Sequence, residues 1–121
     1  MPAITIESIH NVRVKQALRL RDAGVRRQAG RFLIDGEREI ALACRYGFEV
    51  ETIFVLADVA RQAANQPKLR DPYPARFERC LQPVSPAVLA KLSYGQRSAA
   101  PVAVAVSPKR TLSRFAWRAG E

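Results

Sequence analysis

Short apolar segments, separated by stretches with helical periodicity, constrain the fold of this chain more than any other feature. They are Phe32–Ile34, Val50–Leu56 and Pro101–Val106. A further segment, Arg76–Pro83, alternates in polarity and is an ambiguous strand near an edge of the sheet. Apolar strands that alternate with helices are typical of α/β domains, because helices then cover both faces of the sheet. The sequence therefore predicts an α/β domain with a small covered sheet.

The first predicted helix runs from about Asn11 to Asp22, with one apolar stripe at i, i+3, i+4 spacing. Asn11 offers a capping side chain at its start, and Gly24 is expected to end it. Three further helices are expected. Gly36 precedes the first of these three, and Gly47 ends it. Ser85 and Pro86 begin the last one. Their predicted ranges are Glu37 to Tyr46, Asp58 to Ala64 with Asp58 as the cap, and Pro86 to about Ser93.

Length and composition exclude several classes of protein. A chain of 121 residues is expected to form one domain, and no apolar run approaches the roughly 20 residues of a membrane helix. The first residues lack the pattern of a secretory signal, so the cytoplasm is the expected compartment. The two cysteines, Cys44 and Cys80, fall in helical and strand-like patterns, and we interpret both as small core residues.

Positive charge is concentrated near the start of the chain. The net charge is +9, and residues 1–31 contribute +5 of it through seven basic and two acidic side chains. Arginine outnumbers lysine there, which favours bidentate contacts to phosphate or stacking on bases. A solvated basic helix face is the alternative. The charge distribution indicates a polyanionic partner, and RNA is our leading hypothesis.

The sequence contains few residues in patterns typical of a catalytic site. His10 is the single histidine, so it cannot build a multi-histidine metal site, and the sequence suggests no nucleophile for it to activate. Cys44 and Cys80 lack the spacing of a zinc site. The glycine patterns that cradle phosphate in P-loop and dinucleotide-binding proteins are missing as well.

Several motifs in a fixed order resemble one family. They are S-x-x-N-x-x-V-K from Ser8, R-x-x-x-G-R-F-L-I-D-G-E-R from Arg26 to Arg38, VETIFVL from Val50, and PVAVAV from Pro101. Together they are similar to the N-terminal substrate-binding domain of SpoU/TrmH-type RNA 2′-O-ribose methyltransferases, over about residues 3 to 108. The resemblance implies a three-layer α/β/α sandwich with a small mixed sheet, like that of ribosomal-protein-type RNA-binding domains.

The resemblance also implies that RNA binding and catalysis lie in separate domains. In that family a separate C-terminal methyltransferase domain with a knotted fold binds S-adenosylmethionine and carries the catalytic residues. We therefore expect an RNA-binding domain over residues 1–108 and a linker or tail over residues 109–121. No cofactor is expected in this chain, and we expect it not to methylate RNA alone. Whether it is an excised domain or a natural truncation stays open.

The expected RNA contacts come from basic residues around the first helix and the first strand. The partner implied by the resemblance is structured RNA, with ribosomal RNA favoured over tRNA, together with the methyltransferase domain. A module that docks on that domain or forms a dimer is the alternative. The predicted RNA-binding residues are Lys15, Arg19, Arg26, Arg27, Arg31 and Arg38.

Overall fold

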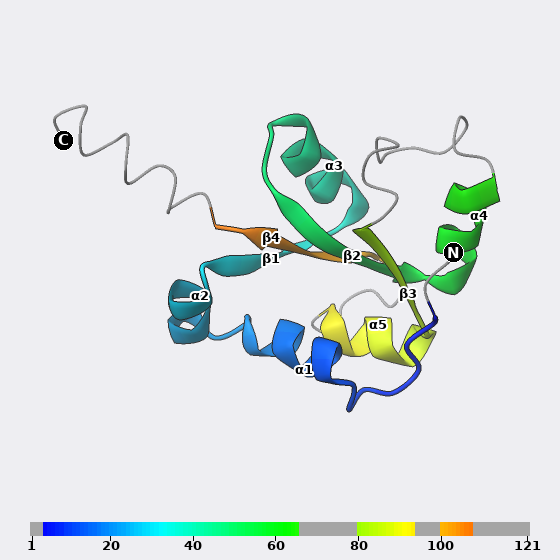
Figure 1. The fold of residues 1–121 in the computed structure, drawn as a ribbon, viewed down its shortest axis with the longest axis horizontal. Coiled ribbons are helices and arrows are strands. Elements are labelled where there is room, and N and C mark those ends of the chain that lie inside the picture. Colours follow the sequence, from blue (N-terminus) through cyan, green and yellow to red (C-terminus); the bar gives the residue numbers. More distant parts are fainter. Residues whose placement is uncertain (1–3, 66–79, 94–99, 108–121) are drawn as a thin grey trace, which may run out of the picture.

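The computed structural model describes residues 4–65, 80–93 and 100–107, without the side chains of residues 62–65. Figure 1 shows a sheet with helices on both sides, which confirms the predicted α/β class. The predicted linker at 109–121, residues 76–79 of the predicted edge strand, and the loop around Gly95 and Arg97 lie outside the described residues. The elements are α1 Val12–Arg19, α2 Ala23–Ala29, β1 Arg31–Asp35, α3 Glu37–Arg45, β2 Val50–Leu56, α4 Ala57–Asn65, β3 Leu81–Val84, α5 Pro86–Leu92 and β4 Val102–Val106.

The sheet is mixed, as the resemblance implied. Its strand order is β1-β4-β2-β3, with β4 antiparallel to both of its neighbours and β3 parallel to β2. The ambiguous strand expected at Arg76–Pro83 is an edge strand over Leu81–Val84, which carries Pro83. The outer side of β3 forms only an isolated bridge with Ile6, in which the Pro83 carbonyl accepts a hydrogen bond and no amide of Pro83 is needed.

Helices α1, α2 and α5 lie on one side of the sheet, and α3 and α4 lie on the other (Figure 1). The two core clusters follow the alternation of β4. Val102 and Val104 point toward the first side, whereas Ala103 and Ala105 point toward the second. Because successive strand residues face opposite ways, this one strand contributes to both cores.

The first predicted helix is wrong in extent, since two helices replace it. α1 ends at Arg19, and α2 begins after Asp22, whose Oδ1 accepts a hydrogen bond from the Val25 amide at 3.1 Å. Gly24 lies inside α2 and does not end α1. An aspartate cap that starts a new helix therefore accounts for the break better than a glycine stop does.

Arg26 holds this break in place. Its Nη1 donates to the carbonyl oxygens of Leu20 and Arg21 at 3.0 and 2.9 Å. Carbonyl groups at the end of a helix lack partners within the helix, so a guanidinium that reaches back to them stabilises the end of α1. Arg26, which the sequence analysis predicted to bind RNA, therefore stabilises the end of α1.

The remaining helices agree with their predicted positions. Ser85 caps α5 by accepting from the Val88 amide at 3.3 Å, and Pro86 occupies the first position. α4 begins at Ala57, so Asp58 lies in its first turn and is not its cap. Gly36 has a φ of +102°, the left-handed region that glycine alone adopts easily, and it turns β1 into α3. None of the helices in the described part of the chain is long and apolar enough to cross a bilayer.

Candidate nucleic-acid interface

A groove lies between α1, α2 and the sheet. Its volume is about 510 Å³, within the roughly 300–1,000 Å³ range of small-ligand sites. It exists because α1 ends at Arg19 while α2 turns away to pack against β1. Its described lining residues are Arg13, Gln16, Ala17, Arg19, Leu20, Val25, Gln28, Ala29, Arg31, Glu51, Thr52, Phe54 and Val104.

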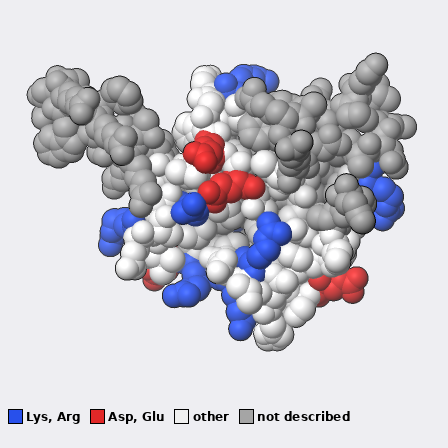
Figure 2. Space-filling view, viewed as in Figure 1, with Lys and Arg blue, Asp and Glu red and all other residues white. Residues whose placement is uncertain are grey.

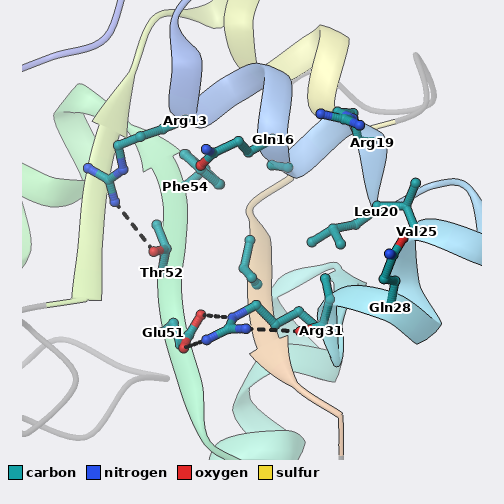
Figure 3. A pocket seen from close by; sticks show the side chains of 13 residues that line it. Arg13, Gln16, Arg19, Leu20, Val25, Gln28, Arg31, Glu51, Thr52 and Phe54 are labelled. Atoms are coloured by element: carbon teal, nitrogen blue, oxygen red, sulfur yellow. Dashed lines mark hydrogen bonds and ion pairs between the residues drawn. The ribbon is translucent and has the colours of Figure 1, made fainter.

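The groove has an apolar floor and a polar rim. Figure 3 shows Leu20 pointing from the end of α1 into the hollow, with Gln16 above it and Thr52 on the β2 wall. The floor belongs to the core beneath α1, where Phe54 and Val104 are 2% and 9% exposed. A rigid apolar floor with hydrogen-bonding groups around it is the usual composition of a ligand site.

Arg13 is fixed at one end of the groove. Its Nη1 donates to Gln82 Oε1 at 2.6 Å, and its Nη2 lies 3.4 Å from Thr52 Oγ1 (Figure 3). Gln82 is held in turn, because its Nε2 donates to the carbonyl oxygens of Ile4 and Pro83. These partners are neutral, so the positive charge of Arg13 is positioned without being cancelled by a carboxylate among the described residues.

Arg31 occupies the other end of the groove and is paired. Its Nε and Nη2 donate to the two carboxylate oxygens of Glu51 at 2.7 and 2.8 Å, and its Nη1 donates to the Ala29 carbonyl. The hydrogen bond and charge of Arg31 lower the pKa of the Glu51 carboxyl, and Glu51 raises the pKa of Arg31. Glu51 is the one acidic residue among the described residues of the lining.

The structure separates the six predicted residues into three groups. Lys15, Arg19 and Arg27 are exposed on α1 and α2, and their side chains form no hydrogen bond or ion pair with other described residues. The guanidinium groups of Arg26 and Arg31 are engaged in contacts within the domain. Arg38 is exposed on α3, which covers the opposite face of the sheet.

Figure 2, viewed as in Figure 1, shows Lys and Arg side chains around the part of the molecule where α1 and α2 lie. Among the predicted residues, only Arg19 and Arg31 line the groove. Sequence reasoning missed Arg13, Gln16 and Gln28 as site residues. A signal for the first two was present, because Arg13, Gln16 and Arg19 are spaced three apart and share one face of α1.

Reactive groups elsewhere among the described residues do not form a second site. The part of the chain that the structure describes holds no group of three or more His, Cys, Asp or Glu side chains that could bind a metal ion. Cys44 is buried, and burial raises the pKa of the Cys80 thiol. A protonated thiol is a poor nucleophile, so Cys80 is suited to packing beside β2.

Comparisons with known proteins agree with this architecture. Residues 11–103 match the family described as the MRM3-like substrate binding domain. A crystal structure of an RNA 2′-O ribose methyltransferase superimposes with a TM-score of 0.62 and 32% identity over 90% of this chain. The SpoU methyltransferase AviRb from Streptomyces viridochromogenes, in complex with AdoMet, gives a TM-score of 0.59 and 26% identity over 82% of the chain.

A third structure, an rRNA methyltransferase from Sinorhizobium meliloti, shares the fold with a TM-score of 0.64 at 16% identity over 88% of this chain and 38% of its own. No curated protein matches closely enough to add a further relative. The chain spans only 40% and 36% of the first two structures. The resemblance to the substrate-binding domain of SpoU-type methyltransferases is confirmed over the core of the chain.

Proposed function

The chain belongs to the family of MRM3-like substrate binding domains, and we propose that it binds RNA as the substrate-recognition part of an RNA 2′-O-ribose methyltransferase. The proposal places methyl transfer in a separate domain. That domain would correspond to the part of the longer similar structures that this chain does not cover. Structured ribosomal RNA is the partner we propose, with tRNA as the alternative.

One observation carries the proposal. Arg13, Arg19 and Arg27 project from one face of the domain with no carboxylate partner among the described residues. Charges in such an array attract the phosphate backbone of RNA and release its counterions, which produces affinity that falls with salt. Lys15 adds a fourth cation on the outer side of α1.

The cofactor of the AdoMet-bound relative does not suit the groove described above. S-adenosylmethionine carries a positively charged sulfonium. The groove has Arg13 and Arg19 at its rim, and its acidic residue, Glu51, is already engaged by Arg31. The described lining residues therefore offer the sulfonium no unpaired carboxylate, and we assign the groove no step in methyl transfer.

The test is a titration of the chain with ribosomal RNA fragments at several salt concentrations. The double variant Arg19→Glu with Arg27→Glu changes the charge on the α1/α2 side of the domain. The variant Arg38→Glu with Arg45→Glu makes the same change on α3 and is the matched control. We expect at least tenfold weaker binding for the first variant and a salt slope that is smaller by roughly two, as the loss of two phosphate contacts predicts.

Two results would contradict the proposal: no binding of the unaltered chain at low salt, or equal weakening by both double variants. The alternative of a docking or dimerisation module is favoured by Leu42 on α3 and by Tyr46 directly after it, which are 42% and 75% exposed. Size-exclusion chromatography of the chain with and without RNA separates these roles. A dimer that forms without RNA and is lost in Tyr46→Ser would support the alternative.

A further inference from the structure

We infer that the groove between α1 and α2 receives an unpaired nucleobase, so that this domain selects single-stranded or looped RNA over continuous duplex. This inference rests on the proposed RNA-binding function and adds a ligand site to it. Phosphate contacts alone do not require a hollow in the protein surface. The chain nevertheless combines Arg13 and Arg19, which have no carboxylate partner among the described residues, with a groove that has an apolar floor.

The walls of the groove have the chemistry that a base edge needs. Gln16 lies on α1 and Gln28 on α2, and neither side chain forms a hydrogen bond with another described residue. A glutamine amide both donates and accepts, which matches the mixed donor and acceptor pattern of a base edge. Two such amides on different helices can contact one planar ligand from two directions.

The floor of the groove suits the face of a base. Leu20, Phe54 and Val104 form a surface continuous with the core, and each is less than 10% exposed. An aromatic or aliphatic surface is where RNA-binding proteins place bases that have left a helical stack. Because the floor is part of the packed core, its shape is fixed before the ligand arrives.

The charges on the rim fit the phosphates on either side of such a base. Arg13 and Arg19 lie six residues apart on α1, about 9 Å along the helix axis. Gln16 lies midway between them in sequence on the same helix face. The sugar-phosphate backbone can therefore follow α1 while a base turns inward beside Gln16.

The ion pair at the far end of the groove offers a phosphate group little attraction. Arg31 holds the Glu51 carboxylate in two hydrogen bonds, so its charge is already matched. The pair is close to neutral as a unit, whereas the Arg13 and Arg19 end is strongly positive. This difference gives the ligand a direction, with phosphates along α1 and the base pointing toward β1 and β2.

The experiment compares two RNA probes of equal length: a mixed-sequence single strand and the same sequence in a blunt duplex. The variant Gln16→Ala with Gln28→Ala removes both amides without changing charge. We expect it to bind the single strand about tenfold more weakly, as the loss of two neutral hydrogen bonds predicts. Duplex affinity and the salt slope should not change.

A second measurement does not depend on the variants. In a spectrum of methyl-labelled protein, the single strand should shift the methyl signals of Leu20, Val25 and Val104, which line the groove. The signals of Val55, buried on the other side of the sheet, should stay in place. The duplex should leave all four unchanged.

The outcomes distinguish failure of the base site from failure of the proposed RNA-binding function. If the glutamine variant binds both probes as the unaltered chain does and the groove methyl signals do not move, the base site is refuted while RNA binding stands. If the unaltered chain binds neither probe at low salt, the proposed function itself fails. Selective loss of single-strand binding, with shifts confined to the groove, supports the site.

Discussion

The two faces of the sheet are covered by helices in different ways. On one face, α3 is continuous and packs over Ala103 and Ala105, the small residues of β4. On the other face, β4 presents Val102 and Val104, and the covering helix is broken between α1 and α2. Small residues allow a helix to approach closely, whereas larger residues beneath a broken helix leave a hollow. Both faces hold a buried core, and the groove forms only on the side where the covering helix is broken.

The charges follow the same division. On α4, Arg61 pairs with Asp58 at 3.2 Å, and Arg38 lies beside Glu37 and Glu39 in the sequence of α3. On the α1/α2 side, Arg21 pairs with Asp35 and Arg31 pairs with Glu51. The side chains of Arg19 and Arg27 have no acidic partner among the described residues. Cations that lack a carboxylate partner attract phosphate more strongly than cations held in ion pairs.

The largest expected difference in stability comes from adding volume to each face. Ala103→Leu places a larger side chain beneath α3, where Ala103 is fully buried, and we expect it to destabilise the domain by about 1–3 kcal/mol. Ala29→Leu enlarges a half-buried residue that lines the groove, so we expect a change within about 0.5 kcal/mol. Urea unfolding measures both variants. Equal losses would show that the two faces are packed alike.

Adjacent arginines on α2 provide the next comparison. Arg26→Ala removes the hydrogen bonds that hold the end of α1, and we expect a loss of about 1.5–2 kcal/mol. Arg27→Ala removes an exposed side chain, and its stability should change by less than about 0.5 kcal/mol. In RNA titrations only Arg27→Ala should bind more weakly once both variants are folded. The reverse pattern would exchange the structural and binding roles assigned here.

The break between α1 and α2 depends on the cap at Asp22. Asp22→Ala leaves the Val25 amide without its acceptor, and we expect a cost of about 1 kcal/mol. Amide hydrogen exchange should accelerate in α2 and stay unchanged in α5, which has its own cap at Ser85. Uniform acceleration across the domain would mean that α2 does not open independently of the core.

The smallest expected effect concerns the ion pair at the end of the groove. Glu51→Gln should cost about 0.5–1 kcal/mol near neutral pH, since the pair is bidentate but partly exposed. The pKa of Glu51 is lowered in the folded state, so its contribution is present above the ordinary value of 4.5 and is lost as pH falls through the lowered pKa. Glu7→Gln, an exposed control, should show no such loss. A difference that persists in strong acid would contradict the assignment.

Local chemistry explains what the sequence could predict. The strand at Val50–Leu56 and the helix start at Ser85 and Pro86 each depend on residues within a few positions, and the structure has them as expected. The turn at Gly36 also belongs to this group, because its backbone conformation favours glycine whatever surrounds it.

Contacts between residues far apart in the sequence explain what the sequence could not predict. The partner of Arg31 is Glu51, twenty residues away, and only the strand order β1-β4-β2 shows that the two meet across β4. Arg26 and Arg27 look equivalent in the sequence, but one turns toward the end of α1 and the other toward solvent. The groove itself depends on the break after Arg19, and the apolar spacing of Val14, Ala17 and Leu18 does not mark that break because all three lie before it.

The measurement that tests the central claim most directly is an RNA titration followed through the backbone amide signals of the chain. If RNA binds the α1/α2 side, the signals that move should belong to residues 12–30 and to the start of β2 at Glu51 and Thr52. The signals of α3, residues 37–45, should remain in place at the same RNA concentration. Shifts centred on α3, with residues 12–30 unaffected, would contradict the account.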